Sequence, residues 1–179
     1  YEKSRMTIEM KQREFHPVSP EEKHAHAEIT KKVHAVPALL ELARAPADYE
    51  RIVLWFEHDL YDQAALVRVL AGLALRKKLP RIELIAIDRF RGIKRFIGLG
   101  QLSAAQLATL WPRRKRISRR QLVLGAKTWA ALRAPTPEPI EALCKSDLRV
   151  LPFLKAALQR QLQELPWTND GLSLTERNA

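Results

Sequence analysis

The sequence predicts an α/β fold: a short parallel sheet formed by one βαβ unit, followed by a largely helical C-terminal half. Two apolar runs rich in β-branched residues, 52–56 and 82–87, are typical of buried strands. Between them, residues 60–74 repeat apolar side chains at helical spacing. Strand, helix and strand in this order predict two parallel strands joined by a right-handed crossover.

The chain of 179 residues is expected to form one domain with three parts. Residues 1–48 are predicted to form a helical N-terminal arm, because Ser19, Pro20 and Glu22 make a strong helix start. Residues 50–100 contain the βαβ core, and residues 101–179 form the helical half. The chain does not begin with Met and ends shortly after another helix start, so we expect it to be a fragment of a longer protein.

Helix-start signals follow one another beyond residue 100. Ser118 and Gln121 form a capping box, and Ser103 is the candidate cap of the helix before it. Thr136-Pro137 and Pro152 are expected near the starts of two more helices. These signals predict the helical C-terminal half.

Composition limits the class of protein. A single cysteine, Cys144, excludes an internal disulfide and a zinc site with several cysteine ligands, which fits a reducing cytoplasm. No apolar run approaches the roughly 18 residues of a membrane-spanning helix. We therefore expect a cytoplasmic protein without a membrane partner.

Positive charge is concentrated in one quarter of the chain. Residues 76–120 hold fourteen Lys or Arg and two acids, a net charge of +12, whereas the rest of the chain carries −1. Such a field attracts nucleic acid or another polyanion. The alternative is that these side chains only keep the surface soluble.

The stretch from Trp55 to Gln63 changes abruptly from apolar to polar, as expected where a buried strand turns into a helix. Asp88 follows the second strand, so it is predicted to lie at the same edge as Asp59. We predict a catalytic group of His58, Asp59 and Asp62, and a Mg²⁺ or Mn²⁺ ion on Asp59 and Asp88. In the alternative interpretation Asp59 only caps the helix, and Asp62 interacts favourably with the positive end of the helix dipole. This interpretation leaves Glu57 and His58 unexplained.

Basic side chains follow the second strand and form a dense run further along the chain. The residues predicted to bind phosphate or nucleic acid are Arg89, Arg91, Arg113, Arg114, Lys115, Arg116, Arg119 and Arg120. Trp111 precedes the dense run. Its ring is expected either to stack on a nucleic-acid base or, as we favour, to lie in the core. Gly98 and Gly100 form either an anion-binding loop or, as we favour, a tight turn.

Four segments resemble an uncharacterised bacterial family, the domain of unknown function 1835. They are Trp55–Gln63, Gly98–Leu102, Leu151–Leu158 and Gly171–Glu176. The resemblance implies an α/β domain with a further strand before residue 50 and a helical segment after the last motif. It implies no activity, and the family's segment at 113–120 need not be basic.

Three hypotheses about function follow. The first is a phosphate-directed domain that contacts nucleic acid, with an acidic edge and arginines that hold the phosphate backbone. The second is a non-catalytic regulatory or interaction module in which Asp59 is a helix cap. The third is an enzyme that acts on a small molecule at the same edge, so the sequence leaves open whether the chain is an enzyme.

Overall fold

The computed structural model describes residues 49–178, so the predicted N-terminal arm lies outside the described residues. Strand β1 (Arg51–Glu57) and strand β2 (Arg81–Ile87) are parallel neighbours over their full length. Helix α4 (Leu60–Ala74) connects them. The predicted βαβ unit is therefore confirmed.

A third strand makes the sheet mixed, which the sequence did not predict. Strand β3 (Lys115–Arg116) is antiparallel to β2 and pairs at Glu83 and Leu84. The Ile117 N–H extends the pairing by donating to the Ile82 carbonyl at 2.9 Å. Two residues are too few to show a strand period, so only the neighbouring strand reveals β3.

The C-terminal half is helical, as predicted. Its elements are η2 (Leu99–Gln101), α5 (Ala104–Leu110), η3 (Trp111–Arg113), α6 (Arg119–Leu132), α7 (Glu138–Cys144), α8 (Leu154–Gln163) and α9 (Leu174–Arg177). Capping boxes begin α5, α6 and α9 at Ser103, Ser118 and Ser173. Within residues 49–178 no helix combines the length and apolar composition that a membrane crossing requires.

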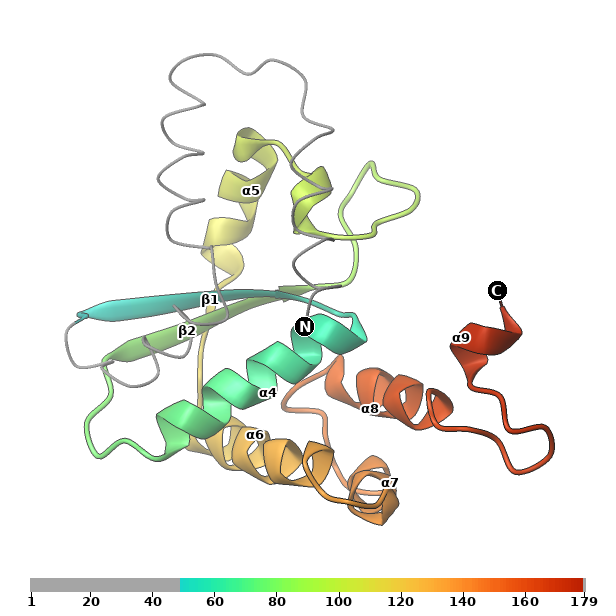
Figure 1. Ribbon diagram of the computed structural model, residues 1–179. Helices are drawn as coiled ribbons and strands as arrows, with labels where there is room; N and C mark the ends of the chain where they lie inside the picture. Colours follow the sequence, from blue (N-terminus) through green and yellow to red (C-terminus); the bar gives the residue numbers. More distant parts are fainter. Residues whose placement is uncertain (1–48, 179) are drawn as a thin grey trace.

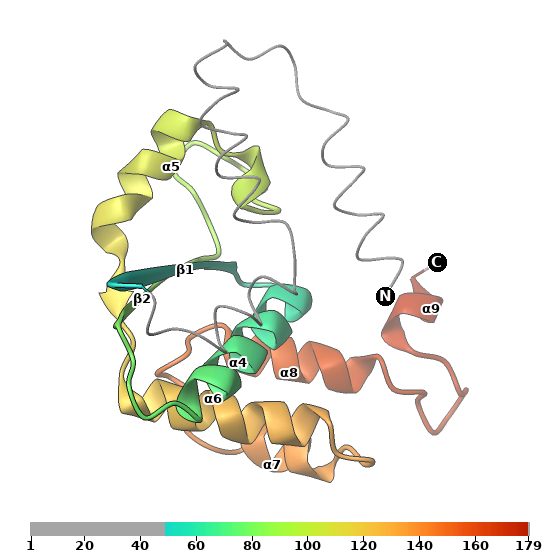
Figure 2. The ribbon, with the colours of Figure 1, turned by 60° about the vertical axis from the view of Figure 1, so that its left-hand side comes forward.

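The sheet lies between two layers, with α4, α6, α7 and α8 on one face and α5 with its preceding loop on the other (Figures 1 and 2). Ile52, Leu54 and Phe56 of β1 join the larger core with the four helices. Val53 and Trp55 pack on the opposite face against the smaller core. Because both faces of the sheet are buried, the strands do not alternate between apolar and polar side chains.

The sheet has two ends that carry different side chains. At the carboxyl end, β1 and β2 finish at Glu57 and Ile87, followed by Asp88. Both strands begin at the amino end. Strand β3 pairs with β2 near this end, where Arg116 lies opposite Glu83. A strand rises about 3.3 Å per residue, so Glu83 and Asp88 are separated by roughly 16 Å along β2.

Candidate functional site

The strand-to-helix turn at the carboxyl end is closed by its own carboxylates. Asp59 caps α4, because its Oδ1 accepts the Asp62 N–H at 2.8 Å. Asp62 Oδ2 in turn accepts the Glu57 N–H at 2.6 Å. Both side chains therefore stabilise the backbone of the turn, in agreement with the helix-cap interpretation.

A helix cap alone does not explain Glu57. The Glu57 side chain binds the backbone of the glycine loop, residues 98–100. Its side chain is buried, and its Oε1 accepts the Leu99 N–H at 2.6 Å. A Cβ added to Gly98 would lie only 2.4 Å from Glu57 Oε2, so glycine is required for this close approach. The N–H group of the glycine loop thus binds the Glu57 carboxylate. The loop is a tight structural turn.

Two glutamines complete this region. Gln63 is buried, and its Nε2 donates to the Glu57 carbonyl at 2.6 Å. Gln101 Oε1 accepts the Ile97 N–H at 2.6 Å, which closes the turn from the other side. A glutamine in the first turn of a helix is the sequence signal of such a backbone role, but apolar periodicity alone does not identify it.

His58 contacts the rings of two phenylalanines. Its ring centroid is 6.5 Å from that of Phe96 and 6.3 Å from that of Phe153. Its buried Nδ1 has no hydrogen-bond partner among the described residues. A histidine base is normally oriented by a partner on its second nitrogen. Asp59 and Asp62 are both bonded to the turn, and the catalytic group of His58, Asp59 and Asp62 stays a prediction.

Asp88 is paired with the residue that follows it. Arg89 donates from Nε at 3.0 Å and from Nη2 at 2.7 Å. These bonds, with smaller contributions from the charges of Arg89 and His58, hold the pKa of Asp88 below its usual value despite partial burial. Asp88 therefore stays ionised, but its charge is already matched by a guanidinium.

The predicted Mg²⁺ or Mn²⁺ site does not fit these contacts. Within residues 49–178, no group of three or more His, Cys, Asp or Glu side chains lies close enough to hold a metal ion. Asp59 is directed to the N–H of Asp62, and Asp88 is paired with Arg89. Both predicted ligands thus have other partners, and no third ligand joins them.

The amino end carries a charged cluster that the sequence did not single out. Glu83 is only 2% exposed, although it is charged. Arg81 Nη2 donates to its Oε1 at 2.9 Å, and the Nε atoms of Arg51 and Arg114 both lie 3.4 Å from its Oε2. Burial would raise the pKa of Glu83, but the Arg81 hydrogen bond and the three positive charges together lower it. We call these four residues the Glu83 cluster.

The sequence contains a signal for this cluster. Arg51 and Arg81 are the first residues of two parallel strands, and the register places them side by side. Glu83 is the only acid within the apolar run of β2. A lone acid in a buried strand predicts a cationic partner, because an unpaired buried charge is strongly unfavourable.

The predicted phosphate-binding residues are divided between the two ends of the sheet. Arg89 and Arg91 follow β2 at the carboxyl end. The other six flank or form β3 at the amino end: Arg113, Arg114, Lys115, Arg116, Arg119 and Arg120. Of these eight residues, only Arg89 and Arg91 follow the strand end that carries Asp88, because β3 pairs with the beginning of β2.

Trp111 lies beside the Glu83 cluster and is not in the core, contrary to the favoured interpretation. Its ring stacks on Trp55 with centroids 6.4 Å apart, and the Arg114 guanidinium carbon lies 4.5 Å from its centroid. The Trp111 side chain nevertheless remains 41% exposed. The structure thus gives the amino end a partly exposed aromatic surface.

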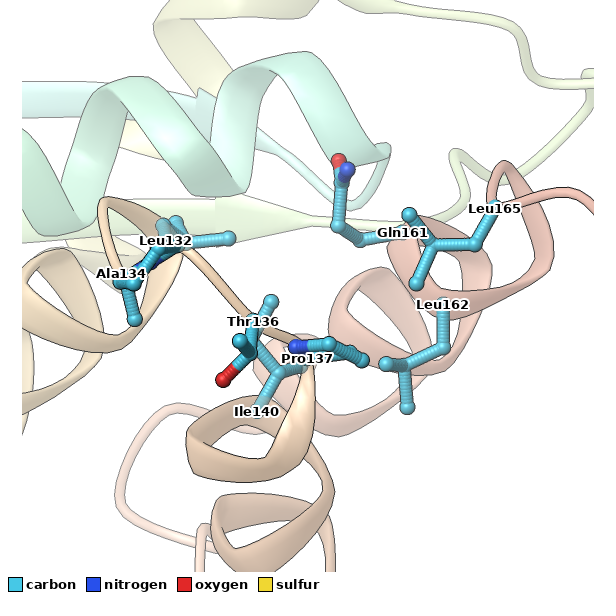
Figure 3. A pocket seen from close by; sticks show the side chains of 9 residues that line it. Leu132, Ala134, Thr136, Pro137, Ile140, Gln161, Leu162 and Leu165 are labelled. Atoms are coloured by element: carbon cyan, nitrogen blue, oxygen red, sulfur yellow. The ribbon is translucent and has the colours of Figure 1, made fainter.

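A small pocket of about 140 Å³ lies elsewhere, between the ends of α6, α7 and α8 (Figure 3). Leucines, prolines and Ile140 form most of its lining, with Thr136 and Gln161 as polar members. None of its nine lining residues is a predicted site residue or carries an acid or base. The pocket therefore supports no catalytic interpretation.

Three of the motifs that carry the family resemblance contact one another. Glu57 of the first motif bonds Leu99 of the second, and His58 contacts Phe153 of the third. Comparisons of this chain with protein-family models, with curated proteins and with solved structures found no match.

Proposed function

We propose that this chain is a non-catalytic module that binds nucleic acid through the phosphate backbone, at the amino end of the sheet. One observation carries the proposal. Arg113, Lys115, Arg116 and Arg119 are exposed and form no ion pair within residues 49–178. At the carboxyl end, by contrast, Glu57, Asp59 and Asp62 accept the backbone N–H groups of residues 99, 62 and 57.

The Glu83 cluster strengthens the positive field at this end. One carboxylate faces three guanidiniums, so the cluster keeps a surplus of two positive charges. Arg51 and Arg81 have side chains that are 44% and 54% exposed, which leaves donors available to a phosphate. Because Glu83 already orders these side chains, a phosphate would meet arginines that lose little further freedom.

The beginning of α6 supports the same assignment. Its first turn contains Arg119 and Arg120 and no acid, although acids are the residues that stabilise a helix N-terminus. Cations at this position cost a helix up to about 1 kcal/mol. Arg120 pairs with Asp147 at 3.1 Å, but Arg119 has no such partner among the described residues. A bound phosphate would offset this unfavourable charge.

The test is the salt dependence of oligonucleotide binding. We expect the parent to lose much of its affinity between about 50 and 200 mM salt, because phosphate contacts release counterions. The triple variant Arg113→Gln, Lys115→Gln and Arg116→Gln should reduce the slope of log affinity against log salt by about 2 for a single strand. All three side chains are exposed, so the melting temperature should stay near that of the parent.

A matched control removes the same charge from the other end of the sheet. Arg91, Lys94 and Arg95 are also exposed and follow β2. Changing all three to Gln should leave the slope nearly unchanged. Equal losses in both triple variants would assign binding to net charge alone, and an affinity independent of salt would overturn the proposal.

An acidic protein is the second candidate partner, because the same cations attract carboxylates. Competition separates the two candidates. Polyglutamate at equal charge concentration should displace the oligonucleotide poorly. Displacement at equal charge concentration would favour the protein partner.

A further inference from the structure

We infer that the amino end binds single-stranded nucleic acid in preference to a duplex, with Trp111 as the surface on which a base stacks. The inference rests on the proposed function and names its substrate class. It depends on how the Trp111 ring is held, and on what lies next to it.

The Trp111 indole is ordered by its neighbours and yet remains partly exposed. It belongs to η3, directly before β3, and packs against Trp55 from the underlying strand β1. Arg114 donates from Nη1 to the Trp111 carbonyl at 2.7 Å, and its guanidinium carbon lies over the ring at 4.5 Å from the centroid. A ring that is held in this way loses little conformational freedom when a base stacks on its exposed part.

Arg114 connects the aromatic surface to the phosphate-binding side chains. Its guanidinium carbon is 4.5 Å from the Trp111 centroid, and its Nε is 3.4 Å from Glu83 Oε2. The same carboxylate holds Arg51 and Arg81. The aromatic surface and the exposed donors of Arg51 and Arg81 therefore belong to one connected group, joined by Arg114 and Glu83.

A single strand can use both parts of this group, but a duplex can use only one. Unpaired bases offer their flat faces to aromatic rings, and the adjacent backbone offers phosphates to arginine. In a duplex the base faces are covered by neighbouring base pairs, so the phosphates alone remain accessible. The charges therefore favour both forms, whereas Trp111 adds affinity for the single strand alone.

The experiment compares a fluorescently labelled single strand with a duplex of the same length, at one salt concentration. Trp111→Ala should weaken binding of the single strand about tenfold and binding of the duplex less than about twofold. Trp111→Leu keeps apolar cover over Trp55 but removes the aromatic face. It should weaken single-strand binding similarly while its melting temperature stays closer to that of the parent.

Trp167 provides a matched control. It is 42% exposed, and Arg177 lies 4.0 Å from its ring, so its surroundings resemble those of Trp111. It belongs to the segment between α8 and α9, on the opposite side of the molecule from α5 (Figures 1 and 2). Trp167→Ala should leave the affinity for both forms unchanged.

The outcomes distinguish this inference from the proposed function. Equal effects of Trp111→Ala and Trp111→Leu on single strand and duplex would overturn single-strand preference, while salt-dependent binding would still support the proposed function. A parent that binds the duplex as tightly as the single strand would also overturn it. Absence of binding to either form would overturn the proposed function as well.

Discussion

The two ends of the sheet differ in what their charged side chains contact. At the carboxyl end, the side chains of Glu57, Asp59 and Asp62 accept backbone N–H groups, those of residues 99, 62 and 57. At the amino end, one buried carboxylate serves three arginines, and the cations around β3 point to solvent. Charge at a strand end thus indicates a binding site only where the chain does not supply the partner itself.

The difference has a physical cause. The turn from β1 into α4 and the loop before η2 bring backbone N–H groups into partly buried positions, where each requires an acceptor. Acids at these positions satisfy that requirement. At the amino end Glu83 pairs with three guanidiniums and Asp147 pairs with Arg120, and the cations left without an ion pair among the described residues are Arg113, Lys115, Arg116 and Arg119. Substitutions at four positions test this contrast.

Glu57→Ala should have the largest effect on stability. It leaves the Leu99 N–H without its charged acceptor, and the loss of such a bond costs about 2–3 kcal/mol in the free energy of unfolding. Chemical denaturation measures this loss, with Glu141→Ala on the exposed face of α7 as the control. Oligonucleotide affinity should stay within about twofold of the parent, because Glu57 lies at the other end of the sheet. A larger change would show that the carboxyl end also contributes to binding.

Gly98→Ala should cost about 1–3 kcal/mol, because the new methyl group would overlap the Glu57 carboxylate. Gly100→Ala is a close control, since a Cβ at Gly100 has no neighbour within 4 Å. Denaturation of both variants measures the contrast. Equal stabilities would show that Glu57 can move away without loss, and that the loop does not depend on it.

Asp59→Ala should cost about 1 kcal/mol by removing the cap of α4, whereas Asp59→Asn should cost only a few tenths. Asparagine caps a helix as well as aspartate does, but it is a poor ligand for a divalent ion. Thermal unfolding with and without millimolar Mg²⁺ separates the two roles. A stabilisation by Mg²⁺ that Asp59→Asn abolishes would restore the metal interpretation.

Glu83→Gln should lower stability, because three arginines lose their shared carboxylate, and should tighten oligonucleotide binding a few-fold. Gln still accepts a hydrogen bond from Arg81, and the variant gains one unit of positive charge, so the salt slope should steepen by about 0.7. Unchanged or weaker binding would show that the Glu83 cluster does not contact phosphate.

The pH dependence of Glu83→Gln follows from the lowered pKa of Glu83. The unfolded carboxyl titrates near 4.5 and the folded one lower, so the ionised group adds stability above about pH 4.5. This contribution disappears as the pH falls through the folded pKa. The stability difference between parent and variant should therefore be full at pH 7 and shrink below pH 4.5.

Local patterns predicted most of the fold. The apolar runs of β1 and β2, the helical spacing of α4 and the serine caps of α5 and α6 are short-range signals that the structure confirms. The site was harder to predict. The helix-cap interpretation of Asp59 is confirmed. The roles of Glu57 and Gln63 depend on backbone groups that apolar periodicity does not identify.

The sequence by itself determined the βαβ unit, the helical half and the concentration of positive charge, because each depends on residues close together in the chain. Only the tertiary structure decided where that charge lies. The pairing of β3 with β2 placed Arg116 opposite Glu83 and brought Arg51, Arg81 and Arg114 to one carboxylate. Residues 51, 83 and 114 become neighbours through strand register and loop path, and these long-range contacts leave no period in the sequence.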